Sequence, residues 1–135
     1  MASLKSISAP MIMIIDDEEG IRNLLEVKFY REGFRVLVAA TAMHAQQMLR
    51  GGKEVDLILC DMKMPKMSGL DLFTYTRELQ MNVPFILITG YAEKEKIAEA
   101  VRLGISDIIL KPARHQDIIE KVRRHFSMDI SLKAS

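Results

Sequence analysis

Side chains that can hold a metal ion or a phosphoryl group lie at the ends of short apolar runs in this 135-residue sequence. Asp16 and Asp17 follow the first run, Asp61 follows the third, Thr89 ends the fourth and Lys111 follows the fifth. Clustered carboxylates repel one another, and a hard divalent cation such as Mg²⁺ relieves that repulsion. A carboxylate beside such an ion can form an aspartyl phosphate, which a lysine and a hydroxyl would stabilise. If folding gathers these residues, the sequence predicts phosphoryl transfer to an aspartate.

Each of these residues also has an ordinary structural interpretation. Asp16 and Asp17 could cap a following helix and complement its dipole. Asp61 could form a turn, Thr89 could be a simple strand-end residue, and Lys111 could be a solvated surface lysine. All of them nevertheless fall at the carboxyl ends of apolar runs, which is the edge where open parallel sheets bind ligands. This shared position favours the functional interpretation.

The apolar runs alternate with longer amphipathic segments. The runs are rich in Ile, Val and Leu and mostly do not alternate with polar residues, which is typical of strands buried on both faces of a parallel sheet. They lie at Met11–Ile15, Arg35–Ala39, Val55–Cys60, Pro84–Thr89 and Ser106–Leu110. The expected helices carry Ile21, Leu24, Leu25 and Phe29, span Thr41–Arg50, Ser68–Gln80 and Glu93–Leu103, and carry Ile118, Ile119, Val122 and Phe126. The pattern predicts a (βα)₅ α/β fold, a doubly wound three-layer sandwich.

Capping residues agree with these boundaries. Thr41 and Ser68 are suitable N-caps, and Asp71 would complete a capping box with Ser68. Glycines follow three of the helices, where a left-handed residue is favoured, at Gly33, Gly51-Gly52 and Gly104.

The composition, with 49% hydrophobic and 27% charged residues, is that of one globular domain. A net charge of +1 gives no general attraction to nucleic acid or to an anionic membrane. No apolar run reaches the ~18 residues of a membrane span. The single cysteine, Cys60, allows no internal disulfide and is most simply a small buried strand residue. We expect a cytoplasmic protein that binds neither nucleic acid nor membrane directly.

Four segments resemble the signature segments of response regulator receiver domains. They read IIDDEE, CDMKMPKMSGLDL, LITGYA and GISDIILKPA, and the most specific part is the D-x-x-M-P-x-M-x-G run at Asp61–Gly69. The resemblance implies a receiver domain at residues 9–126, with residues 127–135 as a C-terminal tail or the start of a linker. It also implies a flavodoxin-like sheet with the strand order 2-1-3-4-5.

The resemblance implies a Mg²⁺ site, with Mn²⁺ as an alternative. Asp61 would be the phosphoacceptor and a metal ligand, Asp17 a direct ligand and Asp16 a ligand acting through water. The backbone carbonyl of Lys63 would complete the protein ligands. The phosphoryl donor would be a sensor histidine kinase or a phosphotransfer protein, and the domain would catalyse only its own phosphoryl transfer and dephosphorylation.

The resemblance also implies a switch on the same edge. Thr89 would be the switch hydroxyl, and Lys111 would pair with the phosphoryl group, with a cis bond to Pro112. The family usually has an aromatic residue where this sequence has Ile108. Tyr91 is the nearest aromatic residue, and with Lys63 it would flank the pocket, where the family tunes the access of water.

Other phosphate chemistry fits less well. A haloacid-dehalogenase-type enzyme needs a second Asp where this sequence has Lys63. A P-loop would need Gly at Gln47 and Ser or Thr at Glu54. The acidic run Asp16–Glu19 would repel a flavin phosphate.

The output of the domain has two interpretations. The chain could be a single-domain regulator that binds an output partner, or the receiver part of a longer chain with an output domain. No DNA-reading motif follows Phe126. The basic residues near the C-terminus are more typical of a solvated helix face, and a partner or homodimer surface is the alternative.

Overall fold

The computed structural model describes residues 9–126, and in this range five parallel strands form one sheet. The strands are β1 (Met11–Ile15), β2 (Arg35–Ala39), β3 (Leu57–Asp61), β4 (Phe85–Thr89) and β5 (Asp107–Leu110). Their order in the sheet is β2-β1-β3-β4-β5, and every neighbouring pair is parallel. The predicted fold class and strand order are confirmed. The expected tail at 127–135 lies outside the described residues.

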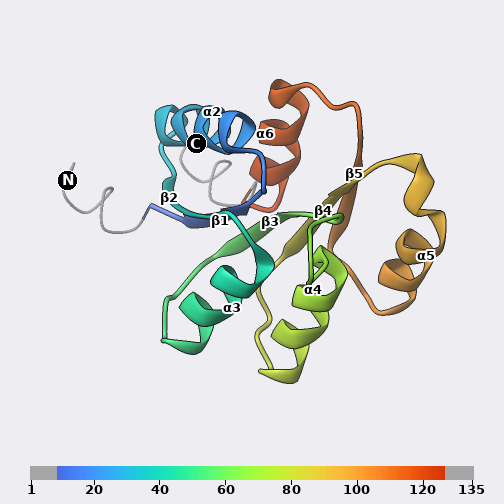
Figure 1. Cartoon of the computed structure of the whole chain (residues 1–135). Coiled ribbons are helices and arrows are strands. Elements are labelled where there is room, and N and C mark those ends of the chain that lie inside the picture. The colour runs from blue at the N-terminus through green and yellow to red at the C-terminus, as the bar shows by residue number, and fades with distance from the viewer. Residues whose placement is uncertain (1–8, 127–135) are drawn as a thin grey trace.

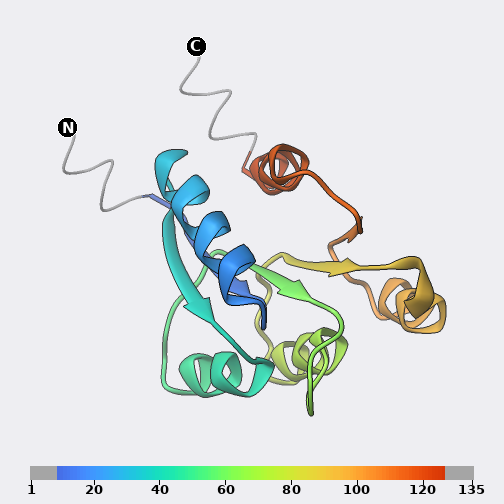
Figure 2. The same cartoon turned by 45° about the horizontal axis from the view of Figure 1, so that its top comes forward.

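Helices cover both faces of the sheet (Figure 1). One face carries α2 (Glu19–Arg31) and α6 (His115–Arg124). The other carries α3 (Ala42–Arg50), α4 (Gly69–Glu78) and α5 (Lys94–Arg102), and a short 3-10 helix, η1 (Tyr91–Glu93), leads into α5. The helices α3 and α4 lie side by side, as both views show (Figure 2). No helix within residues 9–126 is long and apolar enough to cross a membrane.

The two faces of the sheet bury different side chains of the same strands. Met13 and Ile15 of β1 pack toward α3, α4 and α5, while Ile12 and Ile14 pack toward α2 and α6. The strand β3 divides in the same way, and all of its residues are buried. Successive side chains of a strand point to opposite faces of the sheet, and both faces are covered by helices. The side chains on both faces must therefore be apolar. This explains why the apolar runs show no alternation.

Several predicted strand ends shift by one or two residues. The strand expected at Val55–Cys60 lies at Leu57–Asp61, and just before it the Asp56 carboxylate, rather than a backbone carbonyl, accepts the Met11 N–H at 2.8 Å. The strand expected from Ser106 begins one residue later, because the Ser106 hydroxyl accepts the Phe85 N–H at 2.9 Å. Similarly, β4 starts after Pro84, which has no N–H to give to a ladder.

The predicted helix caps are confirmed. The Thr41 hydroxyl accepts the His44 N–H at 3.0 Å, and Ser68 and Asp71 form a reciprocal capping box. After α3 it is Gly52, with φ of 95°, that adopts the left-handed conformation, while Gly51 has φ of −76°. After α4 the residue with the left-handed conformation is Gln80, with φ of 59°, so no glycine in the sequence indicates this position.

Candidate functional site

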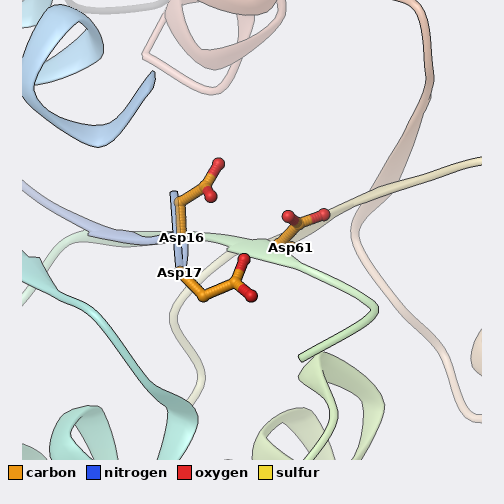
Figure 3. Close-up of side chains that lie close together, drawn as sticks. All are labelled: Asp16, Asp17 and Asp61. Atoms are coloured by element: carbon orange, nitrogen blue, oxygen red, sulfur yellow. The ribbon is translucent and has the colours of Figure 1, made fainter. Parts of the chain in front are cut away.

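The acidic residues meet at the carboxyl edge of the sheet because their strands are neighbours. Ile15 of β1 is paired with Cys60 of β3, so Asp16 and Asp61 leave the sheet side by side. From there the chain enters α2 on one face of the sheet and α4 on the other, and open parallel sheets bind ligands beyond the strand ends where the connections part in this way. Figure 3 shows the carboxylates of Asp16, Asp17 and Asp61 gathered there. One oxygen from each lies within 4.8 Å of the others.

Lys111 reaches the same point from the end of β5. Its Nζ lies 2.9 Å from Oδ1 and 3.1 Å from Oδ2 of Asp61, so one ammonium group contacts both carboxylate oxygens. The Lys111 N–H donates to the Thr89 carbonyl at 2.8 Å, and the Lys111–Pro112 peptide bond is cis, as the resemblance implied. The structure therefore brings the predicted lysine to the predicted phosphoacceptor.

Burial dominates the electrostatics of the two enclosed acids. It raises the pKa of Asp61 above its ordinary value, although the hydrogen bond and charge of Lys111 act in the opposite direction. It also raises the pKa of Asp16, against the hydrogen bond from Glu18. Burial lowers the pKa of Lys111, but the hydrogen bond and charge of Asp61 outweigh it and leave that pKa raised. The ionised acids are thus held at a free-energy cost that a bound cation would offset.

The two acids after β1 differ in how firmly they are held. Asp16 is buried, its Oδ1 accepts the Glu18 N–H at 2.8 Å, and its own N–H donates to Ala39 at 3.2 Å. Asp17 is exposed to solvent. Hard carboxylate oxygens, one of them open to water, suit Mg²⁺, which keeps several waters when it binds proteins. The donor set therefore fits the predicted metal.

The other predicted site residues lie around this cluster at different depths. Thr89 is buried at the end of β4, and its hydroxyl donates to the Gly90 carbonyl at 3.4 Å rather than to Asp61. Tyr91 is 65% exposed, whereas Ile108 is half-buried against the core beneath α3, α4 and α5. Lys63 lies exposed in the loop after β3, and the ligand role of its carbonyl stays a prediction.

The loop after β3 is held by contacts that the sequence did not indicate. The Met62 N–H donates to Ile88 and the Gly69 N–H donates to Met62, each at 2.8 Å, so the loop returns to the strand end before α4 begins. A Cβ on Gly69 would lie 2.4 Å from the Asp61 carbonyl oxygen. Lys66 has φ of 70°, and the Met67 N–H closes a three-residue turn to the Pro65 carbonyl.

Cys60 lies beside the acids but is enclosed. It is fully buried, and its Sγ donates to the Asp61 carbonyl at 3.3 Å. Burial and the neighbouring carboxylates raise the pKa of its thiol well above the ordinary value. The predicted burial of Cys60 in a strand is confirmed, and because the thiolate is the reactive form, its low reactivity stays a prediction.

We expect Asp17→Asn to remove most of the stabilisation by Mg²⁺ and to raise the melting temperature of the metal-free protein slightly. At a Mg²⁺ concentration 100 times Kd, binding adds about 2.7 kcal/mol to the free energy of unfolding, and a hundredfold weaker Kd would leave about 0.4 kcal/mol. The metal-free protein gains because one of the mutually repelling carboxylates is gone. Thermal melts with and without Mg²⁺ measure both effects.

Glu19→Gln is the matched control for Asp17→Asn. It removes the same charge from the first turn of α2 but lies outside the cluster of Asp16, Asp17 and Asp61. It should retain the full stabilisation by Mg²⁺. An Asp17→Asn protein that also retained it would exclude Asp17 as a principal ligand.

Known sequences resemble the chain over most of its length. The family model described as the response regulator receiver domain matches residues 12–123. Sporulation initiation phosphotransferase F of Bacillus subtilis strain 168 is 32% identical over 117 residues, which cover 87% of this chain and 94% of that protein. The regulator of RpoS of Escherichia coli strain K12 is 37% identical over 103 residues, or 76% of this chain, and the match spans 30% of that protein's length.

Solved structures share the fold. The structure of FixJ-N is 31% identical in sequence, with a TM-score of 0.77 and coverage of 87% of this chain and 93% of that one. A CheY-like response regulator receiver domain protein from Methanospirillum hungatei JF-1 is 29% identical, with a TM-score of 0.81. The alignment covers 95% of this chain and 100% of that one. Sequence and fold thus agree over the segment that carries the acidic cluster.

Proposed function

Since the chain belongs to the response regulator receiver domain family of two-component signalling, we propose that it accepts a phosphoryl group on Asp61 with Mg²⁺ and thereby switches its surface. Receiver domains are signalling switches rather than ordinary enzymes, so the reaction is the modification of the domain itself. The observation that carries the proposal is the contact of the Lys111 ammonium with both Asp61 oxygens, beside the carboxylates of Asp16 and Asp17.

The geometry suggests how these groups would act. An oxygen of Asp61 would form the new bond to phosphorus while the bond from phosphorus to the donor nitrogen breaks, and the donor imidazole leaves with that electron pair. Mg²⁺ held by the acids would neutralise charge on the phosphoryl oxygens. The Lys111 ammonium would move from the Asp61 carboxylate to one phosphoryl oxygen. The Thr89 hydroxyl would leave the Gly90 carbonyl and donate to a second phosphoryl oxygen. Charge-assisted hydrogen bonds of this kind are the strongest available there.

We propose residues 9–126 as the receiver domain, phosphorylated in the cytoplasm by a sensor histidine kinase or a phosphotransfer protein. The output would be a bound partner or an attached domain. The match to the Bacillus protein covers 94% of that protein, so a relative of about this extent exists. The match to part of the Escherichia protein supports a receiver within a longer chain.

The test is the covalent product. Incubated with a small phosphodonor and Mg²⁺, the protein should gain one phosphoryl group in its intact mass, and borohydride reduction followed by peptide mapping should place it on Asp61. Without divalent metal the gain should disappear. Modification at another residue, or equal modification without metal, would overturn the proposal.

The switch has a separate readout. A beryllofluoride phosphate mimic with Mg²⁺ should change amide exchange in the segment Gly90–Glu93 more than around Ile108, because Ile108 is apolar, stiff at χ1 and already packed against the core. Thr89→Ala should weaken this response yet leave Asp61 able to accept phosphate, and Thr89→Ser should restore it. Changes centred on Ile108 and absent from Gly90–Glu93 would contradict this route.

A further inference from the structure

Successive peptide groups at the end of β1 are held by different partners. The Asp16 N–H donates to the Ala39 carbonyl at 3.2 Å, and the Glu18 N–H donates to Oδ1 of Asp16 at 2.8 Å. The peptide group between them joins Asp16 to Asp17, and Arg22 Nη1 donates to its carbonyl oxygen at 2.8 Å. Within residues 9–126, Arg22 is the only side chain that holds this peptide group. The peptide that links the two acids therefore depends on one arginine.

Arg22 is placed for this contact by the start of α2. Its own N–H donates to the Glu18 carbonyl at 2.9 Å, which fixes the first turn of the helix. Glu18, the N-cap, makes no side-chain cap hydrogen bond, so the entry into α2 relies on Asp16 and Arg22 instead. The half-buried Arg22 side chain folds back over the end of β1.

The guanidinium group binds a backbone carbonyl rather than a carboxylate. Arg22 forms no ion pair among the described residues, although it follows the acidic run Asp16–Glu19. The carboxylates of Asp16 and Asp17 thus remain available to a cation. At the same time, the hydrogen bond from Arg22 fixes the orientation of the peptide between Asp16 and Asp17. This orientation determines the direction in which the exposed Asp17 side chain extends.

We propose that Arg22 is a positioning residue for the metal site, because it locks the peptide group between Asp16 and Asp17 so that both carboxylates face Asp61. This inference rests on the Mg²⁺ site of the proposed function and adds a residue to it. Groups that orient metal ligands without touching the metal commonly change metal affinity by roughly 10-fold to 100-fold when they are removed.

Charge and geometry predict opposite results for Arg22→Gln. A positive charge beside the site repels Mg²⁺, so its removal alone would tighten binding. Loss of the hydrogen bond to the Asp16 carbonyl frees the peptide and would weaken binding. The sign of the change in Mg²⁺ affinity therefore separates a positioning role from a purely electrostatic one.

The experiment is a calorimetric titration of the metal-free protein with MgCl₂. We expect Arg22→Gln to raise the Mg²⁺ Kd by roughly tenfold. The Kd of Arg22→Lys should lie between those of Arg22→Gln and wild type, because the lysine ammonium can still donate to the carbonyl. Arg31→Gln is the control, because it removes the same charge from the exposed end of α2. Raising Mg²⁺ to saturation should increase phosphorylation of Arg22→Gln above its level at low Mg²⁺, since the nucleophile Asp61 is untouched.

The outcomes distinguish this inference from the proposed function. If wild type binds Mg²⁺ and Arg22→Gln binds it equally well or more tightly, the positioning role is wrong while the metal site stands. If wild type shows no Mg²⁺ binding, both fail. Thermal melts of each metal-free variant show whether the titrated protein is folded, and Arg22→Lys provides the test should Arg22→Gln unfold.

Discussion

Asp61→Asn is expected to abolish phosphorylation while the protein stays folded. The amide group is not a nucleophile, yet it has the shape of the carboxylate and its oxygen can still accept a hydrogen bond from Lys111. The substitution also removes one of the crowded, buried carboxylates whose ionised form the fold disfavours. Intact mass after incubation with a phosphodonor and Mg²⁺ should show no phosphoryl group, against near-complete modification of wild type.

Asp16→Asn is the matched control, because it makes the same substitution in the same cluster but keeps the nucleophile. It should bind Mg²⁺ more weakly and react more slowly, yet its product should still map to Asp61. Asp16 itself should not be modified in Asp61→Asn, because its carboxylate is engaged by the Glu18 N–H and makes no hydrogen bond to Lys111. An Asp61→Asn protein modified to the wild-type extent would refute the assignment.

Gly69→Ala is expected to destabilise the fold and to disturb the phosphoacceptor together. The new Cβ would meet the Asp61 carbonyl oxygen at 2.4 Å and Leu87 Cδ2 at 2.7 Å, and the carbonyl belongs to a strand end that cannot turn aside freely. Overpacking of this kind costs about 1–3 kcal/mol, which lowers the melting temperature by roughly 4–12 °C in a chain of this size. Displacement of the Asp61 backbone should also slow phosphorylation, since a misplacement of about 1 Å can cost a factor of about 10².

Gly20→Ala also replaces glycine with alanine, but it is expected to stabilise the fold. Gly20 lies in the first turn of α2, and a Cβ there would meet nothing within 4 Å. Alanine should therefore stabilise the helix by about 0.5–1 kcal/mol and leave phosphorylation unchanged. Thermal melts and phosphorylation rates of both variants test the pair. If Gly69→Ala behaved like Gly20→Ala, the close approach of α4 to β3 would not be essential.

The fold was predictable because its determinants are local. Strands buried on both faces need continuous apolar runs, and the caps at Thr41 and Ser68 use side chains that contact their own helices. The order of strands and the cis bond before Pro112 came from the resemblance to a family, since no local pattern encodes them. The acidic cluster followed from the placement of its members at strand ends.

Other features depended on contacts between distant segments. Lys66 and Gln80 have positive φ values without the glycine or asparagine that usually signals them. The contact of Gly69 with the Asp61 carbonyl requires the path of the loop after β3, and the hydrogen bond of Arg22 requires the position of the first turn of α2 relative to β1. Such contacts are set by tertiary packing, so residue type alone does not reveal them.

The burial of Cys60 makes the native chain suitable for site-specific labelling. The sequence contains one cysteine, and its thiol is enclosed with a strongly raised pKa. A maleimide dye would therefore react with a cysteine introduced at an exposed position and leave the native one unmodified. Ala92, exposed in η1 beside the Thr89 loop, is such a position. Fluorescence from that site would follow the movement of the loop in real time. Cys60, the residue before the phosphoacceptor, would not need to be replaced.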